Sequence, residues 1–295
     1  MTDKYEAMAR ELEASGEFRI LRRFRPKNVY EVPDSSATKV GILLDLETTG
    51  LDSSRHEIIE MAMVPFTYSN DGRIFEVRTP FLSFNEPSAP IPPEITTLTG
   101  ITDEMVRGHR LDPAEVAAFA NQANLIVAHN AGFDRRFAEK VHPIFAQKPW
   151  ACSVTQVPWD SEGFDGAKLK YLAAGCGFFF EGHRASDDCL ATIEVLARPL
   201  KSTGRPAFAT LLEEARRPTV RILALSAPFE SKDVLKARGY RWSDGSDGRA
   251  KAWYRDVAED AVDAEIAMLE EHVFFRKVQL PKLRLTAKER FSERA

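Results

Sequence analysis

The sequence of 295 residues has few cysteines, no long apolar run and no low-complexity tract, and each absence excludes a class of protein. The three cysteines show neither C-x-x-C spacing nor an even number, which indicates reduced, packed thiols rather than a zinc site or a disulfide framework. No apolar run approaches the roughly 18 residues of a membrane span, and the N-terminus does not resemble a signal peptide. We therefore expect a globular protein of the cytoplasm, with no membrane partner.

Charge is unevenly distributed along the chain. The net charge is −4, but residues 216–295 hold 17 Lys and Arg against 13 Asp and Glu, a net of +4. Residues 1–215 therefore carry −8. An acidic first part is compatible with a carboxylate-rich metal site, and a basic second part with nucleic acid. Both are also compatible with ordinary solvated surfaces.

The hydrophobic pattern predicts an α/β protein in three parts. We expect an N-terminal helix over 3–14 with a linker to residue 38, a main domain over 39–204, and a small basic α+β domain over 218–295. In the main domain, three successive strands precede alternating helices and strands, which predicts a mixed sheet flanked by helices. The strands are expected at 39–49, 56–69, 74–84, 125–130 and 149–154, and the helices at 112–123, 133–146 with a break near Pro143, 168–177 and 186–200.

The C-terminal part predicts a separate small fold. We expect a strand at 219–226, a helix at 231–238, paired strands near residues 240 and 254, a helix at about 259–273, and a basic tail. The tail is either a partner-binding strand or disordered. Four aromatic residues among the basic ones could stack on a single nucleic-acid strand or simply build the core of a small domain: Tyr240, Trp242, Trp253 and Tyr254.

Two acids interrupt the apolar stretch ILLDLETTGLD at residues 42–52. Asp45 and Glu47 are two positions apart, so strand geometry directs both side chains to one face. An unpaired buried carboxylate is costly, so the pair needs partners or a cation. Two anions at a strand end suit a hard divalent metal, but a D-x-E motif alone favours an ordinary structural pair.

Two further stretches supply acids at the starts of helices. Asp134, in AHNAGFDRRF, is expected in an opening turn after a buried strand. In HRASDD, His183 and Asp188 are five residues apart, a helical rotation of about 140°, so His183 must lie in the loop before the helix. Four carboxylates could hold two divalent ions, and His183 could accept a proton from an attacking water, as phosphodiester cleavage requires.

The three stretches together resemble the motifs of the DEDDh 3′–5′ exonuclease family. D-x-E lies in a first strand, H-N-x-x-F-D precedes a helix, and H-x-A-x-x-D opens a later helix, all within about residues 39–200. The sequence resembles the proofreading (epsilon) subunit type of bacterial DNA polymerase III, with ribonuclease T and oligoribonuclease as more distant relatives. This resemblance implies a ribonuclease H-like mixed sheet flanked by helices.

The resemblance also implies roles for individual residues. Asp45, Glu47 and Asp188 would bind a first metal ion, with Asp45 bridging to a second that Asp134 holds partly through water. The two ions would be Mg²⁺, with Mn²⁺ as the alternative, and His183 would be the general base. Six residues are expected to hold the terminal nucleotides: Leu46, Thr48, Leu98, Thr99, Asn130 and Phe133. For Phe133 and Leu98, ordinary core packing is the alternative. His129 is interpreted as a packed or hydrogen-bonded strand-end residue.

These observations predict a metal-dependent 3′–5′ exonuclease. It would release nucleoside 5′-monophosphates from single-stranded 3′ ends, with DNA favoured over RNA. The alternatives are an RNA-trimming exoribonuclease and a non-catalytic nucleic-acid-binding protein with a nuclease fold. No segment of the sequence indicates whether a polymerase or another protein is a partner.

Overall fold

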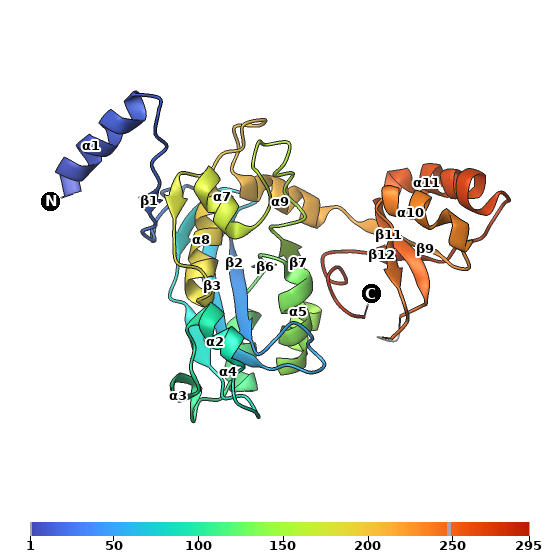
Figure 1. Ribbon diagram of the computed structural model, residues 1–295, viewed down its shortest axis with the longest axis horizontal. Coiled ribbons are helices and arrows are strands. Elements are labelled where there is room, and N and C mark those ends of the chain that lie inside the picture. The colour runs from blue at the N-terminus through green and yellow to red at the C-terminus, as the bar shows by residue number, and fades with distance from the viewer. Residues whose placement is uncertain (1, 247–248, 295) are drawn as a thin grey trace.

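The computed structural model describes residues 2–246 and 249–294 (Figure 1). The predicted N-terminal helix is present as α1 (Thr2–Ala14), which extends away from the body of the molecule (Figure 1). Arg22 anchors this helix, because its guanidinium donates hydrogen bonds to both Glu6 and Glu13 of α1. Arg22 lies in β1 (Arg22–Arg23), which pairs in parallel with β8 (Phe178–Phe179).

A six-stranded mixed sheet forms the centre of the first domain, for which we use residues 38–216. Its strands follow the order β4-β3-β2-β6-β7, with β5 beside β3. The first strands are antiparallel, whereas β6 and β7 run parallel to β2, and this α/β arrangement confirms the predicted ribonuclease H-like sheet. The strands are β2 (Thr38–Thr48), β3 (Ile58–Ser69), β4 (Ile74–Val77), β5 (Phe81–Phe84), β6 (Leu125–Ala128) and β7 (Trp150–Cys152).

The third predicted strand, 74–84, is divided in the structure into β4 and β5, and its prediction as one strand was wrong. Both pieces pair with β3, at opposite ends of that strand. Pro80 precedes β5, and proline has no backbone N–H to donate to a sheet ladder. The chain therefore leaves the ladder between the two pieces and rejoins the same edge of β3 further along that strand.

Helices cover both faces of this sheet (Figure 1). Residues alternate along β2, so Leu43 packs on the face covered by α8 and α9, whereas Ile42 and Leu44 pack on the face covered by α4 and α5. Asp45 and Glu47 share the face of Leu43. The helices are α2 (Pro93–Thr99), α3 (Asp103–Val106), α4 (Pro113–Asn121), α5 (Ala131–Val141), α6 (Ile144–Gln147), α7 (Leu169–Gly175), α8 (Ala185–Ala197) and α9 (Ala207–Arg216). Among the described helices, none is long and apolar enough to cross a membrane.

Helix α9 was not predicted, and it lies beyond the predicted domain end at residue 204. Its Phe208 is fully buried and makes edge contacts with Phe66 and Tyr68 of β3, at ring distances of 5.3 and 5.1 Å. The segment therefore belongs to the core of the first domain. The preceding STGRP stretch, which suggested a boundary, is a turn between two packed helices.

The C-terminal domain, for which we use residues 219–285, has its own antiparallel sheet in the order β10-β11-β9-β12. Tyr240 is buried and Trp253 packs against the core, so of the two alternatives for the four aromatic residues, a single stacking platform does not form and a role in the core is confirmed for these two. Trp242 lies beside Trp253 at 5.5 Å, and Tyr254, the next residue along the strand, faces the other side of the sheet. The elements are β9 (Thr219–Ala224), η1 (Phe229–Ser231), α10 (Lys232–Ala237), β10 (Arg241–Ser243), β11 (Ala252–Ala258), η2 (Glu259–Ala261), α11 (Val262–Leu269), a π turn (Glu270–Phe274) and β12 (Lys282–Leu285).

The basic tail is neither disordered nor free for a partner, contrary to both sequence-based expectations. Its first part is β12, which completes the small sheet beside β9. Its second part, residues 286–294, returns to the first domain, where Trp150 N–H donates to the carbonyl of Ala287 at 2.7 Å. The fully buried guanidinium of Arg135 donates to the carbonyls of Lys288 and Arg290, at 2.5 and 2.7 Å. This tail segment holds the two domains together.

Candidate active site

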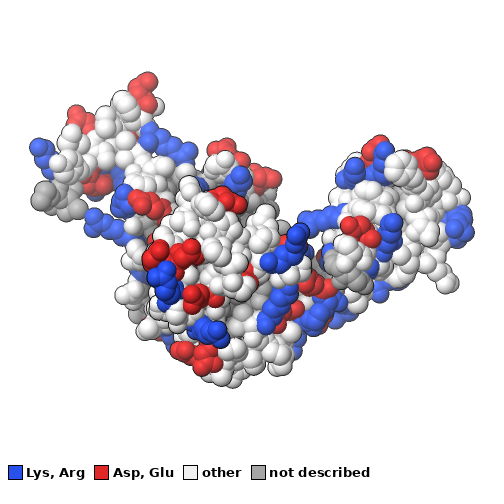
Figure 2. All heavy atoms as spheres, turned by 60° about the horizontal axis from the view of Figure 1, so that its bottom comes forward, with Lys and Arg blue, Asp and Glu red and all other residues white. Residues whose placement is uncertain are grey.

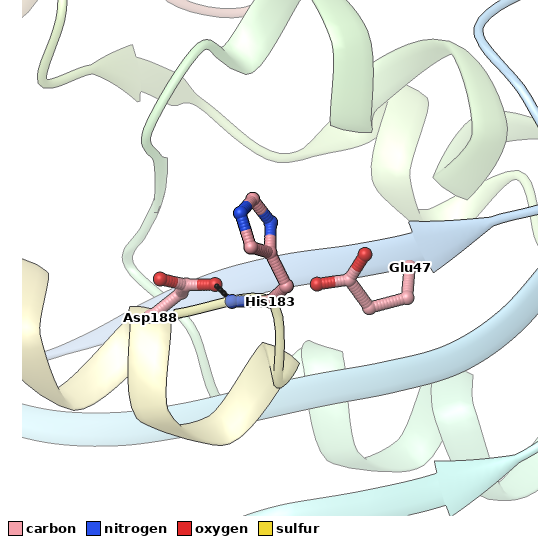
Figure 3. Close-up of side chains that lie close together, drawn as sticks. All are labelled: Glu47, His183 and Asp188. Atoms are coloured by element: carbon pink, nitrogen blue, oxygen red, sulfur yellow. Dashed lines mark hydrogen bonds between the residues drawn. The ribbon is translucent and has the colours of Figure 1, made fainter. Parts of the chain in front are cut away.

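The first and third sequence motifs meet at one end of β2, whereas Asp45 and Asp134 lie outside the group whose ligand atoms converge. Glu47 lies near the end of β2, Asp188 in the first turn of α8, and His183 in the loop just before α8, where the sequence analysis placed it (Figure 3). One ligand atom from each of these three residues lies within 4.8 Å of the others. His183 has a φ of 73°, a left-handed conformation that a non-glycine residue adopts only when its surroundings hold it there.

The carboxylate of Asp188 fixes this loop. It accepts a hydrogen bond from the backbone N–H of His183 at 2.8 Å (Figure 3). The imidazole Nε2 of His183 lies 3.3 Å from Nζ of Lys170. A lysine ammonium can only donate, so Nε2 must be the accepting nitrogen of a neutral ring. Partial burial, and then the charge of Lys170, lower the pKa of His183 and favour this neutral form.

The acids repel one another and are poorly solvated. Burial, followed by the charges of Asp134, Asp188 and Glu47, raises the pKa of Asp45 well above its ordinary value. Burial raises the pKa of Glu47 to about 8, with Asp188 adding to the effect, and that of Asp188 to about 6. The structure therefore brings the carboxylates of all three motifs into mutual electrostatic contact.

The donor set suits a divalent metal ion. Asp134 is 2% exposed in the first turn of α5, and its Oδ1 has no hydrogen-bond partner among the described residues. Leaving such an oxygen unpaired is costly unless a cation takes its place. Carboxylate oxygens are the ligands that Mg²⁺ prefers, and the charges of Asp134, Asp188 and Glu47 all act on Asp45. The residues present therefore fit a hard divalent cation.

Comparison with known proteins supports the same conclusion. The model of the RNase T exonuclease family matches residues 42–196, more than half of the chain. The chain belongs to this exonuclease family. The predicted family resemblance is confirmed, and the matched range contains all five motif residues.

Individual relatives cover different shares of the chain. A PolC-type DNA polymerase III from Clostridium perfringens is 33% identical over 161 residues, 52% of this chain and 11% of that protein. The epsilon subunit of DNA polymerase III from Treponema pallidum is 28% identical over 202 residues, 64% of this chain and 89% of that protein. A zinc-bound Escherichia coli exonuclease I–ssDNA complex aligns with a TM-score of 0.49 at 14% identity, over 85% of this chain and 66% of that chain. The chain thus corresponds to about a tenth of the PolC-type relatives.

Sequence reasoning missed a fifth acid, Glu60, beside the exonuclease motifs. It lies on β3 directly opposite Glu47 and is 6% exposed. Its carboxylate accepts hydrogen bonds from the guanidinium of Arg184 at 2.7 Å and from the N–H of Ala185 at 2.9 Å. Glu60 therefore holds the first turn of α8. An acid inside the apolar stretch HEIIEMAM was the available signal, the same one that identified Asp45.

The six residues expected to hold nucleotides are not equally available. The hydroxyl of Thr48 donates to the carbonyl of Gly50 at 2.7 Å. Thr99 is buried, and its hydroxyl donates to the carbonyl of Ile95, four residues earlier in the chain, at 2.9 Å. Leu46 is a core residue, and Phe133 is half-buried beside Phe137 at 5.1 Å. Leu98 and Asn130 are exposed.

An open cavity of about 810 Å³ adjoins His183 and Asp188. Asn130 and Lys168 also line it, together with Lys170. His129 forms part of the wall, where its Nδ1 lies 2.7 Å from the hydroxyl of Ser153 and burial lowers its pKa to about 4. This neutral, hydrogen-bonded histidine is in the state expected from the sequence. The two lysines give the cavity a positive edge beside the acids.

Proposed function

We propose that the protein is a metal-dependent 3′–5′ exonuclease that releases nucleoside 5′-monophosphates from single-stranded 3′ ends. The observation that carries this proposal is the convergence of Glu47, His183 and Asp188 within 4.8 Å, beside the unpaired buried oxygen of Asp134. A non-catalytic protein with the same fold has no need to keep such a costly set of like charges. Membership in the exonuclease family supports the same activity.

Two divalent ions, Mg²⁺ or alternatively Mn²⁺, would be held by the four carboxylates of Asp45, Glu47, Asp134 and Asp188. When bound, such ions polarise the phosphoryl oxygen and lower the pKa of water, so that a nucleophile forms near neutral pH. The protein's contribution is to fix the four carboxylates on rigid elements, β2, α5 and α8. A prearranged set of this kind costs no reorganisation during the reaction.

His183 would accept the proton of the attacking water at Nε2, the nitrogen that the neutral ring leaves unprotonated. Lys170, beside it, would contact a phosphate of the substrate, because an ammonium binds phosphate as a point charge. Asn130 and Leu98 would contact the terminal nucleotides, since both are exposed. The hydroxyls of Thr48 and Thr99 would contribute less, because each is already bonded within the chain.

We favour DNA over RNA as the substrate. Relatives with similar sequences carry names of DNA polymerase III, both the PolC type and the epsilon subunit. The experiment compares 5′-labelled DNA and RNA oligomers of one sequence, incubated with Mg²⁺ or with a chelator. We expect a ladder of DNA shortened from the 3′ end, free nucleoside 5′-monophosphate, slower RNA cleavage, and no cleavage in chelator. Faster RNA cleavage would favour the exoribonuclease, and intact oligomers in Mg²⁺ the non-catalytic alternative.

The role of His183 is tested by His183→Ala. Loss of a general base typically costs about 10²–10⁴ in rate, so we expect a fall of that size in kcat with a small change in KM. Raising the pH should recover part of the loss, because hydroxide replaces the missing base. The control is His272→Ala, which alters an exposed histidine of the C-terminal domain. A wild-type rate in His183→Ala would exclude the residue from the chemistry.

A further inference from the structure

A second hollow lies between the two domains and is lined by arginines. It has a volume of about 430 Å³, and its walls contain six arginines against two carboxylates. Figure 2 shows Lys and Arg side chains gathered where the C-terminal domain meets the first domain. We call this hollow the arginine cleft. The arginines of the cleft include Arg136, Arg221, Arg241 and Arg290.

Arg290, in the tail segment, makes no direct ion pair with a carboxylate among the described residues. Its side chain is 7% exposed, and it donates to the backbone carbonyls of Glu214 and Arg217 rather than to a carboxylate. Its Nε is buried and has no hydrogen-bond partner among the described residues. A buried guanidinium without an anionic partner is unfavourable. An anion entering the cleft would therefore be stabilised there.

The open face of the small sheet forms the opposite wall. Tyr254 lies there with the guanidinium of Arg221 at 4.8 Å from its ring centroid, and Arg221 is itself paired with Asp256 at 2.7 Å. Arg241 is the cross-strand neighbour of Tyr254. Its side chain is exposed and makes no hydrogen bond or ion pair with any residue that the structure describes. This wall therefore offers a ring and an available guanidinium, a combination that suits phosphates and bases.

The arginine cleft adjoins the cavity beside the active site. Asn130 and Val154 line that cavity, whereas Gly132 and Thr155, one or two residues further along the same segments, line the cleft. A trans peptide spans 3.8 Å between successive Cα atoms, so the rims of the two hollows are only a few ångströms apart. A nucleic-acid strand that extends from the active-site carboxylates past Asn130 would therefore reach the arginine cleft directly.

We propose that the arginine cleft binds the sugar–phosphate backbone of the substrate strand, several nucleotides from the 3′ end that is being cleaved. This inference rests on the proposed exonuclease function, whose active site supplies the other end of the path. Phosphate contacts of this kind carry no sequence information, because they depend on charge. The cleft would therefore retain any single strand while its end is degraded.

The test uses the full chain with Arg136→Ala and Arg241→Ala combined, and Arg276→Ala as the matched control. Arg136 and Arg241 are both exposed, and among the described residues Arg136 has one long ion pair, 3.7 Å from Glu293, so the fold should tolerate both changes. Arg276 is an exposed arginine of the C-terminal domain that does not line the cleft. Binding of a fluorescein-labelled 15-residue oligothymidylate is measured by anisotropy in chelator, between about 50 and 200 mM salt.

We expect the double variant to bind the 15-mer about tenfold more weakly at low salt. Each lost contact to a single strand should reduce the steepness of log K against log salt by about 0.7, hence by about 1.4 in total. In Mg²⁺, the ratio of kcat/KM for the 15-mer to kcat/KM for a dinucleotide should fall by a similar factor. The control should match the wild type in all three measurements.

Three outcomes would overturn the proposal. One is an unchanged Kd and salt slope in the double variant. Another is an equal loss on dinucleotide and 15-mer, which would indicate a structural defect. The third is weaker binding of labelled polyglutamate with unchanged binding of DNA, which would assign the cleft to an acidic protein segment. Because binding is measured in chelator, a failure of the exonuclease proposal itself would appear separately, as a wild-type protein that cleaves neither oligomer in Mg²⁺.

Discussion

The four carboxylates of Asp45, Glu47, Asp134 and Asp188, which we call the acid cluster, and the arginine cleft are regions of opposite charge. In each region side chains of one sign predominate, and each contains a buried polar atom without a hydrogen-bond partner among the described residues, Oδ1 of Asp134 in one and Nε of Arg290 in the other. A nucleic-acid strand whose end is bound to divalent metal would satisfy both regions at once. Unfavourable charge in a folded protein can thus indicate what the protein binds, and at which place.

Asp45→Asn tests the acid side of this comparison and should have the largest effect. Losing a ligand that positions a metal removes several kcal/mol of transition-state stabilisation, so we expect kcat to fall by at least about 10³-fold. In metal-free protein the same change relieves repulsion from Asp134, Asp188 and Glu47, and should stabilise the fold by about 1–3 kcal/mol. Oligomer cleavage and urea unfolding in chelator measure the two effects.

The matched control for Asp45→Asn is Asp187→Asn. Asp187 is exposed on the same helix as Asp188, outside the group whose atoms converge. The Asp187→Asn variant should keep kcat within a few-fold of the wild-type value and leave the free energy of unfolding nearly unchanged. If Asp45→Asn keeps wild-type activity, or destabilises the metal-free protein, the acids do not form a strained cation site.

Arg135→Met tests how the tail segment that contributes to the arginine cleft is held in place. Arg135 is fully buried next to Asp134 in the chain, and its guanidinium bonds the carbonyls of the tail segment and Glu139. Leaving those carbonyls unpaired should cost about 2–4 kcal/mol in unfolding free energy. The freed tail carries Arg290, so the salt dependence of oligomer binding should also become shallower.

The control here is Arg294→Met. Arg294 contacts the same Glu139 at 3.2 Å but is half exposed, so its loss should cost less than about 1 kcal/mol. Equal destabilisation by the two variants would mean that burial of Arg135 contributes nothing special. The result also bears on deletion experiments. Removing residues 216–295 would strip Arg135 of its tail partners, so a change in kcat after that deletion would not report on the C-terminal domain alone.

The two charged regions differ in how far sequence could predict them. Asp45, Glu47, Asp134 and Asp188 occupy regular elements, and strand alternation and helix starts determine where such side chains lie. The arginine cleft depends on contacts without local periodicity. Arg135 meets Arg290 across 155 residues, and no pattern in either segment indicates that pairing. Helix α9 was missed for a related reason, because the flanking STGRP and ARRPT suggested a linker, whereas Phe208 packs between Phe66 and Tyr68.

Glu60→Gln should give the smallest effect and sharpen the boundary of the acid cluster. Glu60 lies opposite Glu47, close enough for its charge to raise the pKa of that residue, yet its oxygens bond Arg184 and the N–H of Ala185. We infer that it positions the start of α8 rather than binding metal. Glutamine keeps the shape and one acceptor oxygen but loses the charge. A slight shift of His183 and Asp188 should then lower kcat about tenfold, since small displacements of reacting groups are costly.

Three readouts separate positioning by Glu60 from metal binding. For positioning, the Mg²⁺ concentration at half-maximal rate stays within twofold of wild type, and KM changes little. Arg184→Gln, which breaks the same ion pair from the other side, should show a similar fall in kcat. The double variant should then lose little more than either single variant, because residues that act through one contact are not additive. If instead Glu60→Gln raises the Mg²⁺ requirement about tenfold while Arg184→Gln does not, Glu60 is a fifth metal ligand. The acid cluster would then extend across two strands.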